Sequence, residues 1–200
     1  MKLSNSEEPL FELDKPQPTA QNVEIKIDKS GKIVDDVQRY MSLKKIDHLK
    51  ISGLRLISPN SESQNQDPES WNLSLSTITT IKTLINICTS LQICGIALKE
   101  DILHELLKEC FNVQEVTVDR VSITDMGLSE KPINYQIKIE KIAFKRMNGI
   151  DMKSFKPILK ISNTEDIEII SCNNSSPDVI SNTFSGKNVR ISDEASEISL

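Results

Sequence analysis

The sequence has few of the residues on which catalytic, metal-binding and membrane-spanning proteins depend. Its 200 residues include two histidines, one tryptophan and six glycines, and aromatic residues make up 4% of the chain. No apolar run of about 18 residues is present, so we expect no transmembrane helix. The glycines are scattered singly and form no phosphate-binding loop, and no nucleophile with an orienting partner is visible. We therefore expect a chain that is not an enzyme and that uses no cofactor.

Acidic residues outnumber basic ones, and this balance narrows the range of partners. The net charge is −5 at pH 7, which disfavours general binding to nucleic acid or to an anionic membrane, because such binders carry a basic patch. Residues 1–9 lack the apolar segment of a secretory signal. We expect a single cytoplasmic domain, and the sequence does not exclude a nuclear location.

The chain contains a short sequence motif, called the phrase below, that recurs seven times. The phrase is apolar at its fourth and sixth positions, and usually again at its ninth and eleventh. The fourth positions are Ile25, Leu49, Leu91, Val116, Ile137, Ile167 and Val189, which are 24, 42, 25, 21, 30 and 22 residues apart. The longest step contains residues 58–70, a polar stretch with two prolines, which is typical of an inserted loop.

Helical spacing fills several of the intervals between these phrases. Apolar residues recur on one helical face over residues 35–43, 74–88, 100–110 and 151–161, although Pro157 should bend or end the last helix. Strands and helices therefore alternate, an order that also describes a doubly wound open sheet. That alternative usually needs units of 30 or more residues and strands that are continuous apolar runs. Units mostly in the twenties, with strands that alternate apolar and polar residues, favour a leucine-rich-repeat solenoid instead.

One unit carries a closer resemblance. Residues 110–128 begin with Cys110-Phe-Asn-Val113 and end with Ile123-Thr124-Asp125-Met-Gly127-Leu128. This segment resembles the cysteine-containing leucine-rich repeat of F-box substrate receptors and ribonuclease-inhibitor-like proteins. The resemblance implies an α/β solenoid: a right-handed β-α superhelix of about seven irregular repeats, with parallel strands on its concave face. The chain departs from the family at the ninth position, where Asn or Cys is expected. That position holds Leu54, Ile96, Val121 and Ile142 in four units and Cys172 in one.

The solenoid interpretation predicts the boundaries of the domain and which strand residues form its concave surface. We expect a polar tail or cap over residues 1–21 and a repeat domain over 22–200, with the polar loop at 58–72 inserted in it. Outward residues at the fifth position are predicted to be Lys26, Lys50, Gln92, Thr117, Lys138, Glu168 and Arg190. At the seventh position they are Asp28, Ser52, Cys94, Asp119, Glu140, Ile170 and Ser192. Stacked parallel strands would align each set as a column on the concave face.

These columns are the candidate partner-binding site. The residues of these columns that we predict to bind a partner are Lys26, Asp28, Lys50, Gln92, Asp119, Lys138, Glu140, Glu168 and Arg190. Mixed charge of this kind suits selection of a protein partner, although a face that is only solvated would look similar. We expect a protein-binding adaptor that works as part of a complex. The alternative is a structural subunit that uses the convex helices or the 58–70 loop, and an enzyme of unrecognised type is least favoured.

Cysteine, histidine and carboxylate clusters give no sign of a metal site. The four cysteines contain no C-x-x-C pair. Cys88, Cys110 and Cys172 are predicted to face the core, whereas Cys94 should point outward, as an ordinary surface cysteine or a reactive thiol. His104 is predicted to be solvated on an amphipathic helix. A polar strand face explains the acidic residues 165, 166 and 168 more simply than a metal cluster does.

Overall fold

Seven parallel strands form the main sheet, and they lie side by side in chain order. The computed structural model describes residues 19–54, 72–125, 137, 139–147, 149–155, 164–172, 180 and 184–192. The strands of this sheet are β1 (Thr19–Ile27), β2 (Lys45–Gly53), β3 (Cys88–Cys94), β5 (Glu115–Asp119), β7 (Lys141–Lys145), β8 (Asp166–Ile170) and β9 (Asn188–Ser192). A second, two-stranded parallel sheet pairs β4 (Ala97–Lys99) with β6 (Ser122–Thr124). The chain is thus α/β, and the order of the described strands does not reverse as it would in a doubly wound sheet.

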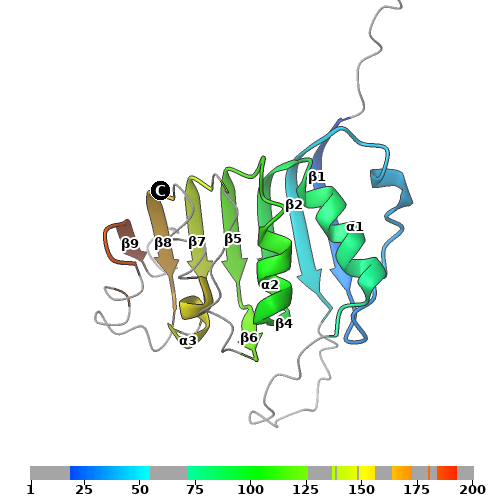
Figure 1. The fold of residues 1–200 in the computed structure, drawn as a ribbon. Helices are drawn as coiled ribbons and strands as arrows, with labels where there is room; N and C mark the ends of the chain where they lie inside the picture. Colours follow the sequence, from blue (N-terminus) through cyan, green and yellow to red (C-terminus); the bar gives the residue numbers. More distant parts are fainter. Residues whose placement is uncertain are drawn as a thin grey trace, which may run out of the picture.

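The helices lie on one side of this sheet (Figure 1). The predicted helices over 74–88 and 100–110 correspond to α1 (Leu75–Ile85) and α2 (Glu100–Leu107). Ser74 caps α1 by accepting a hydrogen bond from the backbone N–H of Thr77, so the helix begins where its first free N–H groups find a partner. The spacing over 35–43 gives only a 3₁₀ turn, η1 (Gln38–Tyr40). The helix expected over 151–161 begins earlier, as α3 (Gly149–Met152) and the 3₁₀ turn η2 (Lys153–Phe155), and residues 156–163 lie outside the described part.

Two columns of apolar side chains form the core beneath the sheet. The fourth-position column is Val23, Leu49, Leu91, Val116, Ile142, Ile167 and Val189, and the sixth-position column is Ile25, Ile51, Ile93, Val118, Phe144, Ile169 and Ile191. Their members on the first six strands are at most 2% exposed, and full burial of such a side chain contributes about 1.5–3 kcal/mol. Phe144 also packs edge-to-face on Phe155 of η2, with ring centroids 5.0 Å apart. Burial of one strand face therefore directs the alternate residues to the opposite face.

The strand pairing corrects the predicted register in two units. Leu49 lies opposite Val23 and not Ile25, and Val116 lies opposite Ile142 and not Ile137. The fourth positions are then separated by 26, 42, 25, 26, 25 and 22 residues along the chain. The corrected spacing is more regular than the spacing predicted from the sequence. The polar loop at 58–72 lies outside the described residues, apart from Asn72.

Sulfur atoms link the ninth positions of successive units. The backbone N–H of Val121 donates to Sδ of Met147 at 3.3 Å, and the backbone N–H of Met147 donates to Sγ of Cys172 at 3.3 Å. Cys172 Sγ in turn donates to the carbonyl of Phe144 at 3.4 Å. In the corrected register Met147, not Ile142, occupies the ninth position of its unit. Cys172 is thus of the type that the resemblance led us to expect at the ninth position, whereas at Met147 a thioether sulfur accepts the backbone hydrogen bond.

The two edges of the main sheet differ. At the first edge, residues 28–35 fold back over β1: Val34 N–H donates to the carbonyl of Lys26 at 3.0 Å, and Asp35 Oδ2 accepts the N–H of Lys26. At the other edge, Ile191 of β9 is 64% exposed, although its column neighbour Ile169 is buried. The cap or tail predicted for residues 1–21 is outside the described residues up to residue 18, and β1 already begins at Thr19.

A glycine allows the hairpin at the first edge to approach α1. Gly31 has φ +77°, and a Cβ there would lie 2.0 Å from the carbonyl oxygen of Asn72 and 2.8 Å from Cα of Leu73. Gly186 has nearly the same φ, +78°, but a Cβ there would meet nothing within 4 Å. The two positions share a left-handed conformation and differ in the space around them.

We therefore expect Gly31→Ala to destabilise the protein much more than Gly186→Ala. The left-handed conformation costs alanine about 1–2 kcal/mol at either position. At Gly31 the backbone of Asn72 and Leu73 must also move, which adds about 1–3 kcal/mol or more. Equilibrium unfolding in urea measures both variants. Equal losses of stability would contradict the close backbone contact at Gly31.

Candidate functional site

The sheet face opposite the helices carries three columns of outward side chains. The third-position column is Asn22, His48, Ser90, Glu115, Lys141, Asp166 and Asn188. The fifth-position column is Glu24, Lys50, Gln92, Thr117, Ala143, Glu168 and Arg190, and the seventh-position column is Lys26, Ser52, Cys94, Asp119, Lys145, Ile170 and Ser192. We call this surface the strand face.

The strand face contains most of the predicted site residues, with changes where the register was wrong. Lys50, Gln92, Thr117, Glu168 and Arg190 share the fifth-position column, as predicted. Lys26 belongs to the seventh-position column, opposite Ser52. The places given to Lys138 and Glu140 are taken by Ala143 and Lys145, because β7 begins only at Lys141. Glu140 precedes that strand, and Lys138 lies outside the described residues.

Asp28 was wrongly placed in a column. It follows the end of β1, and its Oδ1 accepts hydrogen bonds from Ser30 N–H, Ser30 Oγ–H and Lys32 N–H at 2.9, 2.7 and 3.1 Å. These bonds, with that from the Ser30 hydroxyl the strongest, lower the pKa of the Asp28 carboxyl. Asp28 therefore shapes the hairpin turn at the sheet edge.

An ion pair joins the first two strands on this face. Lys50 Nζ lies 2.9 Å from Glu24 Oε1, and the Ser52 hydroxyl donates to the same oxygen at 3.1 Å. The hydrogen bond from Lys50 lowers the pKa of Glu24, and the hydrogen bond to Glu24 raises the pKa of Lys50. Both side chains are about 40% exposed, so the pair orients two charges more than it stabilises the fold.

A second charge cluster, at the carboxyl ends of β5 and β7, was only partly anticipated. Arg146 holds the buried carboxylate of Asp119 with two bonds, Nε to Oδ1 at 2.8 Å and a terminal nitrogen to Oδ2 at 2.5 Å. Arg120 Nε lies 3.4 Å from Asp119 Oδ1, with a side chain that is 54% exposed. Asp119 was predicted to be exposed, but only 3% of it is accessible. Neither arginine was predicted to belong to the site, because both follow the seventh position.

A repeated backbone conformation places these arginines. Four of the eighth positions, Gly95, Arg120, Arg146 and Ser171, have positive φ, from 50° to 62°. Their N–H groups donate to the carbonyls of Asp119, Lys145, Ile170 and Ser192 on the next strand. Three of the four are not glycine, so a glycine pattern in the sequence could not reveal this turn.

All four cysteines are free thiols, and each has a raised pKa. Burial raises the pKa of Cys88 to about 12, and Cys110 is buried still more deeply. Cys94 does lie on the strand face, but it is 7% exposed and its pKa is also raised by burial. The prediction of a surface thiol was therefore wrong, because the flanking strands leave Cys94 little access to solvent.

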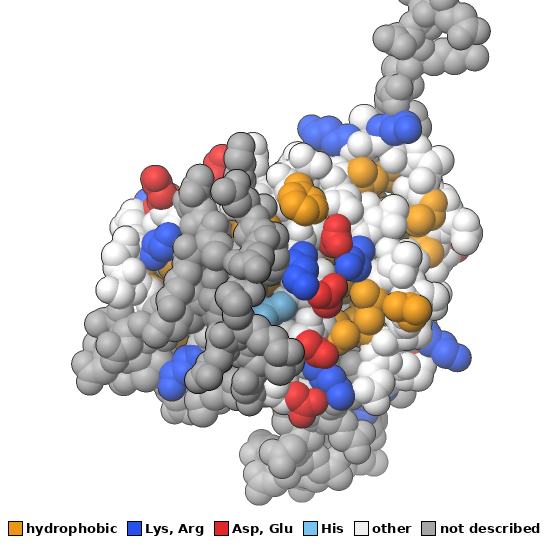
Figure 2. Space-filling model, in the orientation of Figure 1, with side chains coloured by type: hydrophobic (Ala, Val, Ile, Leu, Met, Phe, Trp, Pro, Cys, Tyr) orange, Lys and Arg blue, Asp and Glu red, His pale blue; other side chains and the backbone are white. Residues whose placement is uncertain are grey.

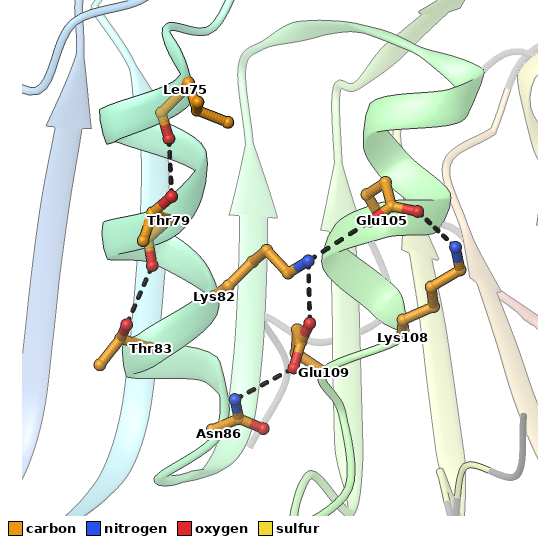
Figure 3. A network of polar contacts seen from close by, with 8 residues as sticks. All are labelled: Leu75, Thr79, Lys82, Thr83, Asn86, Glu105, Lys108 and Glu109. Carbon is orange, nitrogen blue, oxygen red and sulfur yellow. Dashed lines mark hydrogen bonds and ion pairs between the residues drawn. The ribbon is translucent and has the colours of Figure 1, made fainter.

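The helix side contains its own polar network (Figure 3). Lys82 of α1 lies 3.3 Å from Glu105 of α2 and 2.9 Å from Glu109, and Glu105 also pairs with Lys108. His104 is not simply solvated as predicted, since its Nε2 lies 3.0 Å from the carbonyl oxygen of Ser154 and joins α2 to η2. This side also exposes Leu75, 80% accessible, at the start of α1.

Acidic residues on β8 bind basic and amide partners. Glu168 pairs with Lys141 at 2.9 Å, and Asp166 accepts a hydrogen bond from the Asn188 amide at 2.8 Å. Within the described ranges, no group of three or more His, Cys, Asp or Glu side chains is placed to hold a metal ion. None of the helices in the described part of the chain is long and apolar enough to cross a membrane.

Comparisons with protein-family models, with curated proteins and with solved structures give no match to this chain. The geometry of the strand face and of the helix side is therefore the basis for any functional proposal.

We predict that the native thiols react very slowly with a thiol reagent at pH 8. Only the thiolate reacts, and a pKa of about 12 leaves roughly one Cys88 in ten thousand ionised at that pH. Ellman's reagent should therefore count four thiols after denaturation and almost none in the folded protein. Ser192→Cys is the matched control, because Ser192 is exposed in the same column as Cys94. Labelling of Cys94 as fast as labelling of the thiol introduced by that substitution would contradict the burial of Cys94.

Proposed function

We propose that the chain is a leucine-rich-repeat solenoid that binds another protein through its strand face, without catalysing a reaction. Parallel strands in chain order, mostly 25 or 26 residues apart, support the repeat architecture. In that architecture the strands form the concave face of a right-handed superhelix of about seven irregular repeats. Each repeat adds one outward residue to each column, so the face grows with the number of units.

The observation that carries this proposal is the polar, partly ordered character of the strand face. Neighbouring charged side chains are already held in fixed geometry. Examples are the Glu24–Lys50 ion pair and the two hydrogen bonds from Arg146 to Asp119. Pre-oriented side chains lose less conformational entropy when a partner binds. Mixed charges favour specificity and fast association over affinity, which suits an adaptor.

A second candidate is a structural subunit that uses its helix side in a larger assembly. Leu75 at the start of α1 and Phe111 after α2 are 80% and 55% exposed. Figure 2 shows hydrophobic side chains on this side, beside a cluster of acidic and basic ones. Exposed apolar residues of this kind are common at protein interfaces.

One matched pair of substitutions separates the two candidates. Thr117 lies at the centre of the fifth-position column, and Thr83 is exposed on α1. Thr117→Arg places a large cation on the strand face, and Thr83→Arg makes the same change on the helix side. Each tagged variant, with the wild type, is used for affinity capture from an extract of the source cell, and bound proteins are quantified by mass spectrometry.

We expect Thr117→Arg to lose a protein that the wild type and Thr83→Arg both retain. Loss caused only by Thr83→Arg would support the structural subunit and contradict binding at the strand face. Circular dichroism and thermal unfolding of both variants check that each remains folded before capture is compared.

A further inference from the structure

Charge differs between the two ends of the strands, both in the columns of the strand face and at the second and eighth positions that flank these columns. At the second and third aligned positions, where the chain enters the strands, the described charged residues are five acids and two bases: Asp47, Glu115, Glu140, Glu165, Asp166, Lys141 and Lys187. At the seventh and eighth positions they are four bases and one acid: Lys26, Arg120, Lys145, Arg146 and Asp119. The fifth-position column between them has two residues of each sign. We call these two regions the acidic edge and the basic edge. They lie at the two ends of the strands and are distinct from the sheet edges formed by β1 and β9.

The acidic edge is concentrated on three neighbouring strands. Glu115, Glu140 and Glu165 are exposed and form no ion pair within the described ranges. The backbone N–H of Glu140 donates to the carbonyl of Gln114 at 2.8 Å, and that of Glu165 to the carbonyl of Glu140 at 3.2 Å. The three carboxylates are therefore carried by adjacent segments of chain at the same end of the sheet, and Lys141, the base that follows Glu140, is paired with Glu168 at 2.9 Å.

The basic edge lies at the other end of the same strands. Arg120 follows β5, and its N–H donates to the carbonyl of Lys145, so the two side chains come from neighbouring strands. Lys145 forms no ion pair in the described part of the chain, and Arg120 meets only Asp119, at 3.4 Å. Because Arg146 already neutralises Asp119, Arg120 and Lys145 leave an excess of positive charge at this edge.

The distance between the edges follows from strand geometry. From Glu115 to Arg120 the chain advances five residues, which is about 16 Å at the rise of a parallel strand. That separation exceeds the Debye length of about 8 Å at physiological ionic strength, so the two edges act on a ligand as separate charges. Exposed like charges that lie side by side repel one another, and a ligand of opposite charge relieves this repulsion at each edge.

We propose that the strand face selects a protein segment with opposite charges at its two ends, about 16 Å apart. Basic residues of that segment lie over Glu115, Glu140 and Glu165, and its acidic residues lie over Arg120 and Lys145. This inference rests on the proposed function, because it assigns a partner chemistry to the same face. A nucleic acid is disfavoured, since its phosphates would be attracted at one edge and repelled at the other.

Two peptides of identical composition test this polarity. The block peptide has its lysines in one half and its glutamates in the other, and the alternating peptide interleaves them, so both are neutral. Binding to the full chain is measured by fluorescence anisotropy at about 0.1 M ionic strength, where the Debye length of about 10 Å is still shorter than the separation of the two edges. We expect the block peptide to bind about tenfold more tightly, which corresponds to two additional exposed ion pairs.

Two double variants, each with two charged residues replaced by neutral ones, test which charges cause the preference for the block peptide. Arg120→Asn with Lys145→Gln removes charge from the basic edge, and asparagine tolerates the left-handed conformation at residue 120. Glu140→Gln with Glu165→Gln does the same at the acidic edge. Each pair should remove most of the preference for the block peptide. Lys153→Gln, an exposed change on η2, should leave the preference within about twofold.

Equal binding of the two peptides, or a preference that neither pair of substitutions reduces, would overturn the inference. Tighter binding of a single-stranded oligouridine than of the block peptide, lost with Arg120→Asn and Lys145→Gln, would overturn it in favour of a nucleic acid. These results are independent of protein capture with Thr117→Arg. If that substitution abolishes capture and the peptides bind equally, the strand face remains the binding site and only its charge selectivity is rejected.

Discussion

Stacking of aliphatic side chains between parallel strands is the constraint on which the rest of this structure depends. Each strand of the main sheet contributes one side chain to the fourth-position column and one to the sixth, and every such residue on its first six strands is almost inaccessible to solvent. Once these two positions point inward, the third, fifth and seventh positions must point outward. The polar columns of the strand face are thus a geometric consequence of the core.

This constraint explains how much of the fold could be predicted from the sequence. Alternation in five of the seven units placed their strands in the correct register, and the apolar stripes of α1 and α2 identified both helices.

The two register errors arose in units whose apolar spacing fits more than one register. Val23, Ile25 and Ile27 alternate three times, so a shift of two residues leaves an equally apolar phrase. Ile137 and Ile139 precede Ile142 and Phe144 by five residues, and the phrase repeats the same apolar spacing after five positions. Only pairing with neighbouring strands distinguishes these registers.

The candidate site was less predictable, because its geometry depends on contacts between units. Arg120 and Arg146 follow the seventh position, and left-handed backbone conformations at non-glycine residues bring them beside Asp119. The burial of Cys94 likewise comes from neighbouring strands and not from its own position in the phrase. Sequence alternation therefore identifies which residues face outward, whereas the ion pairs and the separation of charge require the register. A register error of two residues was enough to place Asp28 on the strand face and to leave out Glu24.

The parallel register can be tested most directly by NMR of methyl groups in a deuterated chain with protonated isoleucine and valine methyls. Neighbouring strands lie about 4.8 Å apart, so methyl groups in one column should give strong nuclear Overhauser effects. The structure predicts such contacts from Ile142 to both Val116 and Ile167. Contacts from Val116 to Ile137, with none to Ile142, would contradict the register and with it the columns of the strand face.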